Sequence, residues 1–314
     1  MALDTVPWFI GAEGAEHSPA VARMLAYAAT NGATGVISPG DLKVTALPTP
    51  GAAVRIAPGA AVLLNRYPGA SNQSYTVRNA TATDVDVTAT GSSGGATKYL
   101  ILRVDDPEFG GPAPADPKTG PYVRPVWVNS ITNLAYPFVL LSKLVQPAST
   151  ATVTNAMLTD PRQLATPQTH RELVVLSGGS TVADLTNAAF VRWPNVTAPI
   201  DIPEWATHVK VLCRVDGVEQ RLGTVYAEVQ LTLGASLTSA AVPIDINAGA
   251  SSSNPARANF GATLTQKLPT AYPGTTQNLE MKARRANVAA DPGFLRADTK
   301  THLQFDVWFT QEAV

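Results

Sequence analysis

The stretch that decides the fold is Val225-Tyr226-Ala227-Glu228-Val229-Gln230-Leu231-Thr232-Leu233. Valine, alanine and leucine occupy every second position, and Tyr, Glu, Gln and Thr occupy the positions between them. Successive side chains of a β-strand point to opposite faces, so this alternation predicts a strand with one face on an apolar core. Near the C-terminus the alternation recurs, with Leu303, Phe305, Val307 and Phe309 set against His302, Gln304, Asp306 and Trp308. Two such strands are typical of an antiparallel sandwich.

The rest of the second half supplies further apolar runs of strand length. They are Leu173–Leu176, Phe190–Trp193, His208–Val215, Ala258–Leu264 and Leu279–Arg284. Roughly eight strands in a stretch of this length is the pattern of a jelly roll. We therefore expect residues 166–314 to form a jelly-roll-like β-sandwich domain.

The first half predicts one helix at the start of a second β-domain, residues 1–165. Ser18 is placed as the N-cap, Pro19 as the first helical residue, and Asn31-Gly32 as the stop. Val21, Met24, Leu25 and Ala28 recur at helical spacing, which predicts one apolar face packed on the domain.

The strands predicted in the first half are short and separated by glycine and proline. They are 41–47, 54–57, 60–64, 74–78, 84–90, 99–104, 122–128 and 138–145. The second and third of these flank Pro58-Gly59, which predicts a hairpin. Residues 105–120 hold four prolines and three glycines and predict a long loop, and residues 146–170 predict a transition between the domains. The whole chain is thus predicted to be all-β with one short N-terminal helix.

Composition narrows the classes of function. With 23 Lys and Arg against 24 Asp and Glu, the net charge is −1, which argues against nucleic acid as a partner. No apolar run reaches the length of a membrane-spanning helix, so membrane insertion is not expected. Met1-Ala2-Leu3-Asp4 lacks the features of a secretory signal, which predicts synthesis in a cytoplasm. Cys213 is the single cysteine and lies in an apolar run, so we predict that its side chain is buried.

Motifs for catalysis or metal binding are weak. Gly91-Ser92-Ser93-Gly94-Gly95 fits the letters of a hydrolase nucleophile elbow, but a strand rather than a helix is predicted after it. Asp105, Asp106 and Glu108 share one predicted loop, where we expect solvated, turn-forming carboxylates. The four histidines are scattered. We predict no catalytic residue, no cofactor and no bound metal, although a calcium ion at Asp84 and Asp86 or at the loop carboxylates stays open.

Aromatic residues in loops are the remaining candidates for ligand binding. Tyr67, Tyr272 and Phe294 lie among Pro, Gly and polar residues, where an aromatic ring either packs on its own domain or stacks against a ligand. Two predicted loops of the second domain, 251–257 and 269–277, carry Arg257 and Tyr272. We predict these two as the ligand-binding residues, a hydrogen-bonding cation and a stacking ring. Trp8-Phe9-Ile10 forms an apolar start to the chain and is the predicted contact for assembly.

The order of segments in the first half resembles a known family. The segments are Val36-Ile37-Ser38-Pro39-Gly40-Asp41-Leu42-Lys43-Val44-Thr45-Ala46, Val54-Arg55-Ile56-Ala57-Pro58-Gly59-Ala60-Ala61, Ser74-Tyr75-Thr76-Val77 and Arg103-Val104-Asp105-Asp106-Pro107. This series, over roughly residues 8–164, is similar to the N-terminal module of minor tail or baseplate proteins of actinobacterial siphophages.

The resemblance implies a homotrimeric structural protein at the distal end of a phage tail, acting in host attachment without catalysis. It implies other tail-tip proteins and a host cell-surface glycan or protein as partners. A tail-borne carbohydrate-active enzyme, such as a depolymerase, is the alternative. That alternative requires two separated carboxylates or a long repetitive β-helix, and the sequence shows neither. A host-side adhesin is disfavoured by the missing export signal.

Overall fold

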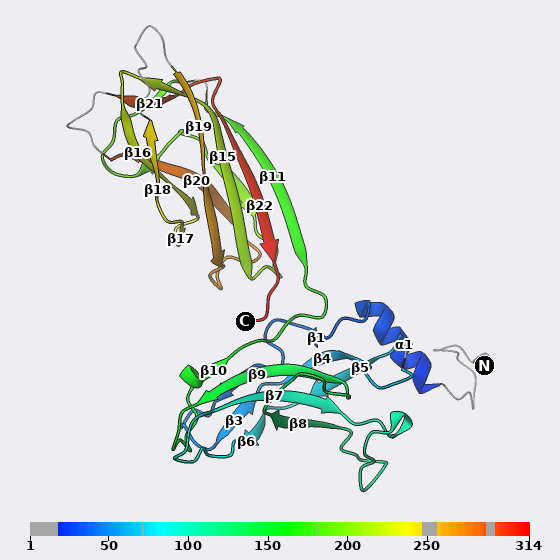
Figure 1. Ribbon diagram of the computed structural model, residues 1–314. Coiled ribbons are helices and arrows are strands. Elements are labelled where there is room, and N and C mark those ends of the chain that lie inside the picture. The colour runs from blue at the N-terminus through cyan, green and yellow to red at the C-terminus, as the bar shows by residue number, and fades with distance from the viewer. Residues whose placement is uncertain (1–17, 71, 180, 247–255, 287–292) are drawn as a thin grey trace. The chain divides into compact units, whose positions relative to one another are not determined.

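A computed structural model describes residues 18–70, 72–179, 181–246, 256–286 and 293–314. Trp8, Phe9 and Ile10, the predicted assembly contact, lie outside the described residues. The chain divides into two compact units, residues 1–167 with 312–314, and residues 168–311 (Figure 1). No helix of the described residues is long and apolar enough to cross a membrane. The prediction of an all-β chain with one short α-helix is confirmed.

Unit 1 combines the helix with three antiparallel sheets. Their strand orders are β1-β4-β5, β2-β3-β6 and β10-β9-β7-β8. The elements are α1 (Pro19–Thr30), β1 (Gly35–Val36), β2 (Val44–Ala46), β3 (Ala53–Ile56), β4 (Gly59–Leu64), β5 (Ser74–Asn79), β6 (Thr83–Asp86), β7 (Ala96–Val104), β8 (Val123–Val128), β9 (Phe138–Gln146) and β10 (Leu158–Thr159), with 3₁₀ turns η1 (Pro107–Phe109) and η2 (Asn155–Met157).

The predicted hairpin around Pro58-Gly59 is wrong. Strands β3 and β4 flank this turn but pair in different sheets, β3 with β2 and β6, and β4 with β1 and β5. Gly59 has φ of 150° and packs so closely on Asp41 that a Cβ there would lie 2.6 Å from the Asp41 Cα. The chain therefore turns from one sheet to the next at this glycine, and local turn chemistry alone could not distinguish that from a hairpin.

Helix α1 begins and ends where its capping residues predict, with Ser18 at the N-cap position and Asn31 in the left-handed conformation at its C-terminal end. The predicted apolar packing face is wrong, because no residue of α1 is buried and Met24 and Leu25 are each half exposed. Polar contacts hold the helix instead. Arg23 bonds to Gln73 and Glu108 and lies over the Phe109 ring.

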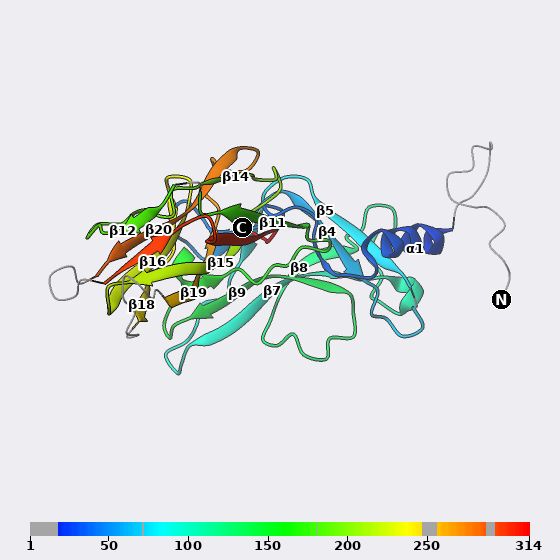
Figure 2. The same ribbon diagram turned by 90° about the horizontal axis from the view of Figure 1, so that it is seen from above.

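Unit 2 is a sandwich of two antiparallel sheets, each six-stranded (Figures 1 and 2). One sheet has the order β11-β22-β15-β21-β12, with β19 also paired to β15. The other has the order β13-β20-β16-β17, with β14 paired to β20 and β18 to β16. The strands are β11 (Thr169–Ser177), β12 (Ala183–Leu185), β13 (Val191–Arg192), β14 (Ala198–Asp201), β15 (His208–Arg221), β16 (Val225–Leu233), β17 (Leu237–Thr238), β18 (Val242–Ile246), β19 (Ala256–Lys267), β20 (Thr276–Arg285), β21 (Phe294–Ala297) and β22 (His302–Thr310).

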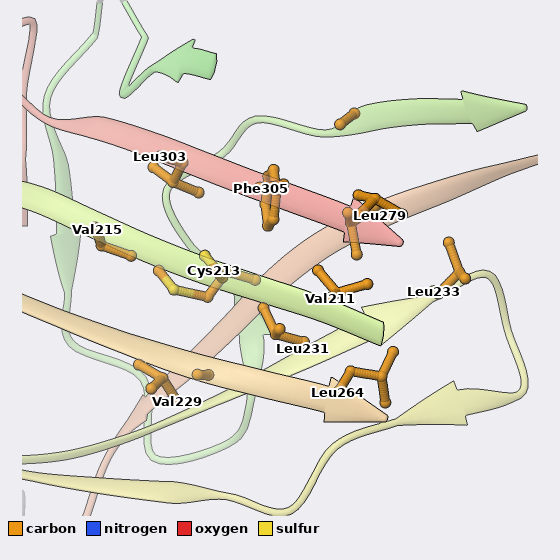
Figure 3. Close-up of a cluster of buried hydrophobic side chains, with 14 of the residues drawn as sticks. Val211, Cys213, Val215, Val229, Leu231, Leu233, Leu264, Leu279, Leu303 and Phe305 are labelled. Carbon is orange, nitrogen blue, oxygen red and sulfur yellow. The ribbon is translucent and has the colours of Figure 1, made fainter. Parts of the chain in front are cut away.

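The core of unit 2 is formed by the alternating residues that the sequence indicated. Phe305 of β22 and Leu231 of β16 come from opposite sheets and are both buried (Figure 3). Cys213 is buried in the same cluster, and this burial raises the pKa of its thiol to about 12. Its neutral thiol packs as a small apolar group, as its sequence context predicts.

Candidate interaction surface

The predicted ligand residue Tyr272 does not offer a stacking face. Its side chain is only 7% exposed and belongs to the core of unit 2. The Ser236 amide donates to the Tyr272 hydroxyl at 2.9 Å, and that hydroxyl donates to the Leu233 carbonyl at 3.3 Å. The hydroxyl is satisfied and the ring is covered, so Tyr272 is a structural residue that fixes the turn after β16. The prediction of a sugar-stacking role is corrected accordingly.

Arg257, the other predicted ligand residue, lies in strand β19 rather than in a loop. Its guanidinium donates to both carboxylate oxygens of Asp298, at 3.0 and 2.6 Å, and to the Gly217 carbonyl. It pairs across the ladder with Glu219 of β15. Tyr272 follows the other end of β19, and ten residues of strand span roughly 33 Å. The structure does not bring the two predicted residues together.

The candidate catalytic groups of unit 1 lie in the loop before β7 and in the segment after it. Residues 91–95 precede β7 directly, so Ser93 has no helix after it, as the sequence predicts. Asp105 is not solvated as predicted but buried, where Arg103 and Arg124 bond to its two oxygens at 2.5 and 2.8 Å. Asp106 accepts from the Glu108 amide and thereby caps η1, a turn that the predicted loop did not include.

A metal site and two cavities of unit 1 are weaker candidates for a functional site than a surface of unit 2. The described residues contain no group of three His, Cys, Asp or Glu that could hold a metal ion. A polar cavity of about 400 Å³ beside Trp127 contains Lys98, whose ammonium already donates to the Thr88 carbonyl and to Gln146. An apolar groove of about 520 Å³ runs along α1, past Leu25 and Ile37. Nothing in the described residues indicates what would cover it.

Exposed apolar side chains gather instead on one face of unit 2, the face of strands β11, β22 and β15 that points away from the core. Cross-strand register fixes its rows. Arg171 pairs with Trp308 and Trp308 with Lys210, while Leu173 pairs with Asp306 and Asp306 with Leu212. Val175 follows in the next row. We call this surface, formed by Arg171, Leu173, Val175, Lys210, Leu212, Asp306 and Trp308, the outer face.

A charged pair lies at the middle of the outer face. Arg171 donates to both oxygens of Asp306, at 2.8 and 2.9 Å, and its guanidinium lies over the Trp308 ring, 4.7 Å from the ring centre. The hydrogen bonds from Arg171 lower the pKa of Asp306 below its ordinary value. Trp308, through a hydrogen bond, and Lys210, through its charge, lower this pKa as well. The bidentate pair therefore stays ionised at neutral pH and fixes the orientation of the arginine above the indole.

Around this pair the outer face carries exposed apolar side chains together with Lys210 and, in the Val175 row, the polar Gln304 and Arg214. Leu173 and Val175 are 54% and 59% exposed, and Leu212 and Trp308 are exposed as well. A surface that combines exposed leucine, valine and tryptophan side chains with an arginine has residue types that are common at protein–protein interfaces. The sequence predicted one residue of this surface. Alternation placed Trp308 opposite the core residues of its strand, but no pattern showed that Leu173 and Val175 lie beside it.

Comparison with known proteins gives no family. No family model and no curated protein matches the sequence. Among solved structures, one of the infectious bursal disease virus Gx strain is 11% identical, with a TM-score of 0.27, covering 90% of this chain and 76% of that chain. Dimeric latent PorU from Porphyromonas gingivalis is 10% identical, with a TM-score of 0.27, covering 90% of this chain and 25% of that chain. Similarities this low carry no argument about function.

Proposed function

We propose that this chain is a structural subunit of a phage tail tip, that it assembles as a homotrimer, and that its sandwich unit contacts a glycan of the host surface. The observation that carries the proposal is the outer face, whose exposed apolar side chains an isolated subunit would leave in water. Burying such a surface between copies is favourable by about 25 cal/mol for each Å² of apolar area. The order of the N-terminal segments supports the tail-tip assignment.

The charge of the chain also favours assembly. Its net charge of −1 gives copies little reason to repel one another. On the outer face the Arg171–Asp306 pair is internally neutralised, so it can enter an interface without an unpaired charge. We infer that the outer faces of neighbouring copies cover one another in the assembled tail tip.

Static light scattering of the purified full-length chain tests the proposal. The wild-type chain should have the mass of a trimer at micromolar concentration. Leu212→Glu places a charge at the centre of the outer face and should shift the mass toward the monomer. Leu222→Glu is the matched control, because Leu222 is an exposed leucine in the turn after β15 and lies off this face. A monomeric wild-type chain would contradict the proposal.

A further inference from the structure

Strand β11 has an unpaired edge that is unusual for its length. All nine of its residues pair with β22 on one side, and no described strand pairs with it on the other. It contains no proline, no lysine and no bulge, and of the usual devices that keep an exposed edge from pairing with another chain it has only the charged side chains of Arg171 and Glu172 in its first half. Its run of Leu173, Val174, Val175 and Leu176 is apolar on both faces of the sheet. Such an edge is complementary to another β-strand.

The same sheet has a second long edge. Strand β19, twelve residues in length, pairs with β15 and with no other described strand. The four strands β11, β22, β15 and β19 lie side by side in this order, and each is antiparallel to its neighbour (Figure 1). Three reversals of direction make β11 and β19 antiparallel to each other. The two free edges of one sheet are therefore matched in direction for antiparallel pairing between copies that point the same way.

Symmetry then selects the pairing. Two β11 strands joined antiparallel would be related by a twofold axis, which gives a dimer and cannot give a cyclic trimer. Pairing β11 of one copy with β19 of the next is heterologous and is compatible with a closed ring of three copies. We propose that a second copy of this chain is the partner of the β11 edge, and that it pairs through β19. This inference rests on the proposed homotrimer and specifies how its copies join.

The consequence for the outer face supports the same arrangement. The second sheet of each sandwich covers the inner face of the four-stranded run. In a closed ring of three copies the second sheets must lie on the periphery, because three of them would not fit inside the ring. The outer face of each copy then turns toward the symmetry axis. Leu173, Val175 and Trp308 then face the axis of the ring, together with Lys210, instead of bulk solvent. One geometry satisfies both the free backbone edges and the exposed apolar side chains.

Cysteine cross-linking of the full-length chain tests the edge pairing. Leu173→Cys is combined with Thr263→Cys or with Thr265→Cys, two exposed β19 residues that share the outer face. Directly opposed residues of an antiparallel pair reach disulfide distance. Mild oxidation should give a covalent trimer with at least one of the two combinations, and each single variant should stay uncross-linked. The native Cys213 is buried and provides an unreactive background.

Each outcome has a defined meaning. Covalent dimers from Leu173→Cys alone would show β11 paired with β11 and would overturn the proposal. A trimer by light scattering that gives no cross-link in either combination would also overturn it, while leaving the proposed homotrimer in place. As a second measurement, the double variant Leu173→Lys and Val175→Lys should shift the mass to the monomer. Val182→Lys, at a comparably exposed valine outside the strand, should leave the trimer intact.

Discussion

Arg171 of β11 lies over the indole ring of Trp308, its cross-strand partner on β22, and reaches Asp306 two residues before that tryptophan. The contact joins the edge strand of the sandwich to its neighbour on the side away from the core. It places a cation, a carboxylate and an aromatic ring within one apolar surface. The arrangement separates the two roles of strand β22, whose inward residues stabilise the unit and whose outward residues are available to a partner.

The two faces of β22 should respond differently to substitution. Phe305 is 1% exposed, so Phe305→Ala should lower the free energy of unfolding by about 3–5 kcal/mol, the usual cost of removing a buried aromatic ring. Trp308→Ala should cost the monomer less than Phe305→Ala but should weaken trimer formation. Urea denaturation below the association range and light scattering above it measure the two effects. A Trp308→Ala chain that unfolds as readily as Phe305→Ala would show that the ring belongs to the core.

Much of the sandwich is predictable from the sequence because its strands alternate cleanly. Val225–Leu233 is observed with the predicted bounds. The inward set of β22, exemplified by Phe305, is buried as predicted. Period-two alternation reports directly which side chains leave water, and that burial dominates the energetics of the sheet.

The candidate surface was less predictable, for a physical reason. Tyr272 lies among Pro, Gly and polar residues as an exposed ring would, yet tertiary contacts bury it. Leu173 and Val175 lie in an unbroken apolar run, which reads the same for a central strand and for an edge strand. Which strands end a sheet is set by long-range pairing, so local sequence does not contain that information.

The Arg257–Asp298 pair should be visible in the pH dependence of stability. Hydrogen bonding from Arg257 lowers the pKa of Asp298 from 3.8 to about 2. A depressed carboxyl pKa contributes stability that is present above the unfolded value and lost as the pH falls through the folded value. We expect the wild-type chain to lose this contribution between about pH 4 and pH 2. Asp298→Asn should be less stable at pH 5, and the difference from wild type should shrink at pH 2.5, as measured by urea denaturation.

The C-terminal residues should stabilise unit 1. The Arg162 side chain is fully buried, donates to Asp160 at 2.7 Å and to the Val314 carbonyl at 2.9 Å, and also donates to the Asp41 carbonyl. Arg162→Met should cost about 3 kcal/mol, at the low end for a broken buried pair because Asp160 is partly exposed. Deleting residues 312–314 removes the Val314 acceptor for Arg162 and the bond from the Val314 amide to the Pro39 carbonyl, and should cost about 1–3 kcal/mol. Arg55→Met, at an exposed pair with Asp84, is the control and should leave stability unchanged.

We predict no hydrolytic activity for the loop at residues 91–95. Its serine is followed by strand β7, so no helix N-terminus is available to stabilise an oxyanion beside it. Wild type and Ser93→Ala should give the same background rate with chromogenic esters, and neither should release reducing sugar from host cell-wall polysaccharide. Ester hydrolysis that disappears in Ser93→Ala would contradict this prediction and favour the enzyme alternative.

Attachment to host cells should depend on the trimer. A single shallow glycan contact is weak, whereas three copies joined in one assembly bind an array of receptors with an apparent affinity roughly 10²–10⁴ times higher when the spacing matches. Leu212→Glu, which should separate the copies, is therefore expected to lower adsorption by this order while leaving the fold of unit 2 intact. Leu222→Glu should adsorb like wild type. Adsorption of fluorescently labelled full-length chains measures the effect, with circular dichroism as the control for folding. Equal adsorption by monomeric Leu212→Glu and trimeric wild type would contradict this prediction, because host attachment would then not depend on trimer formation.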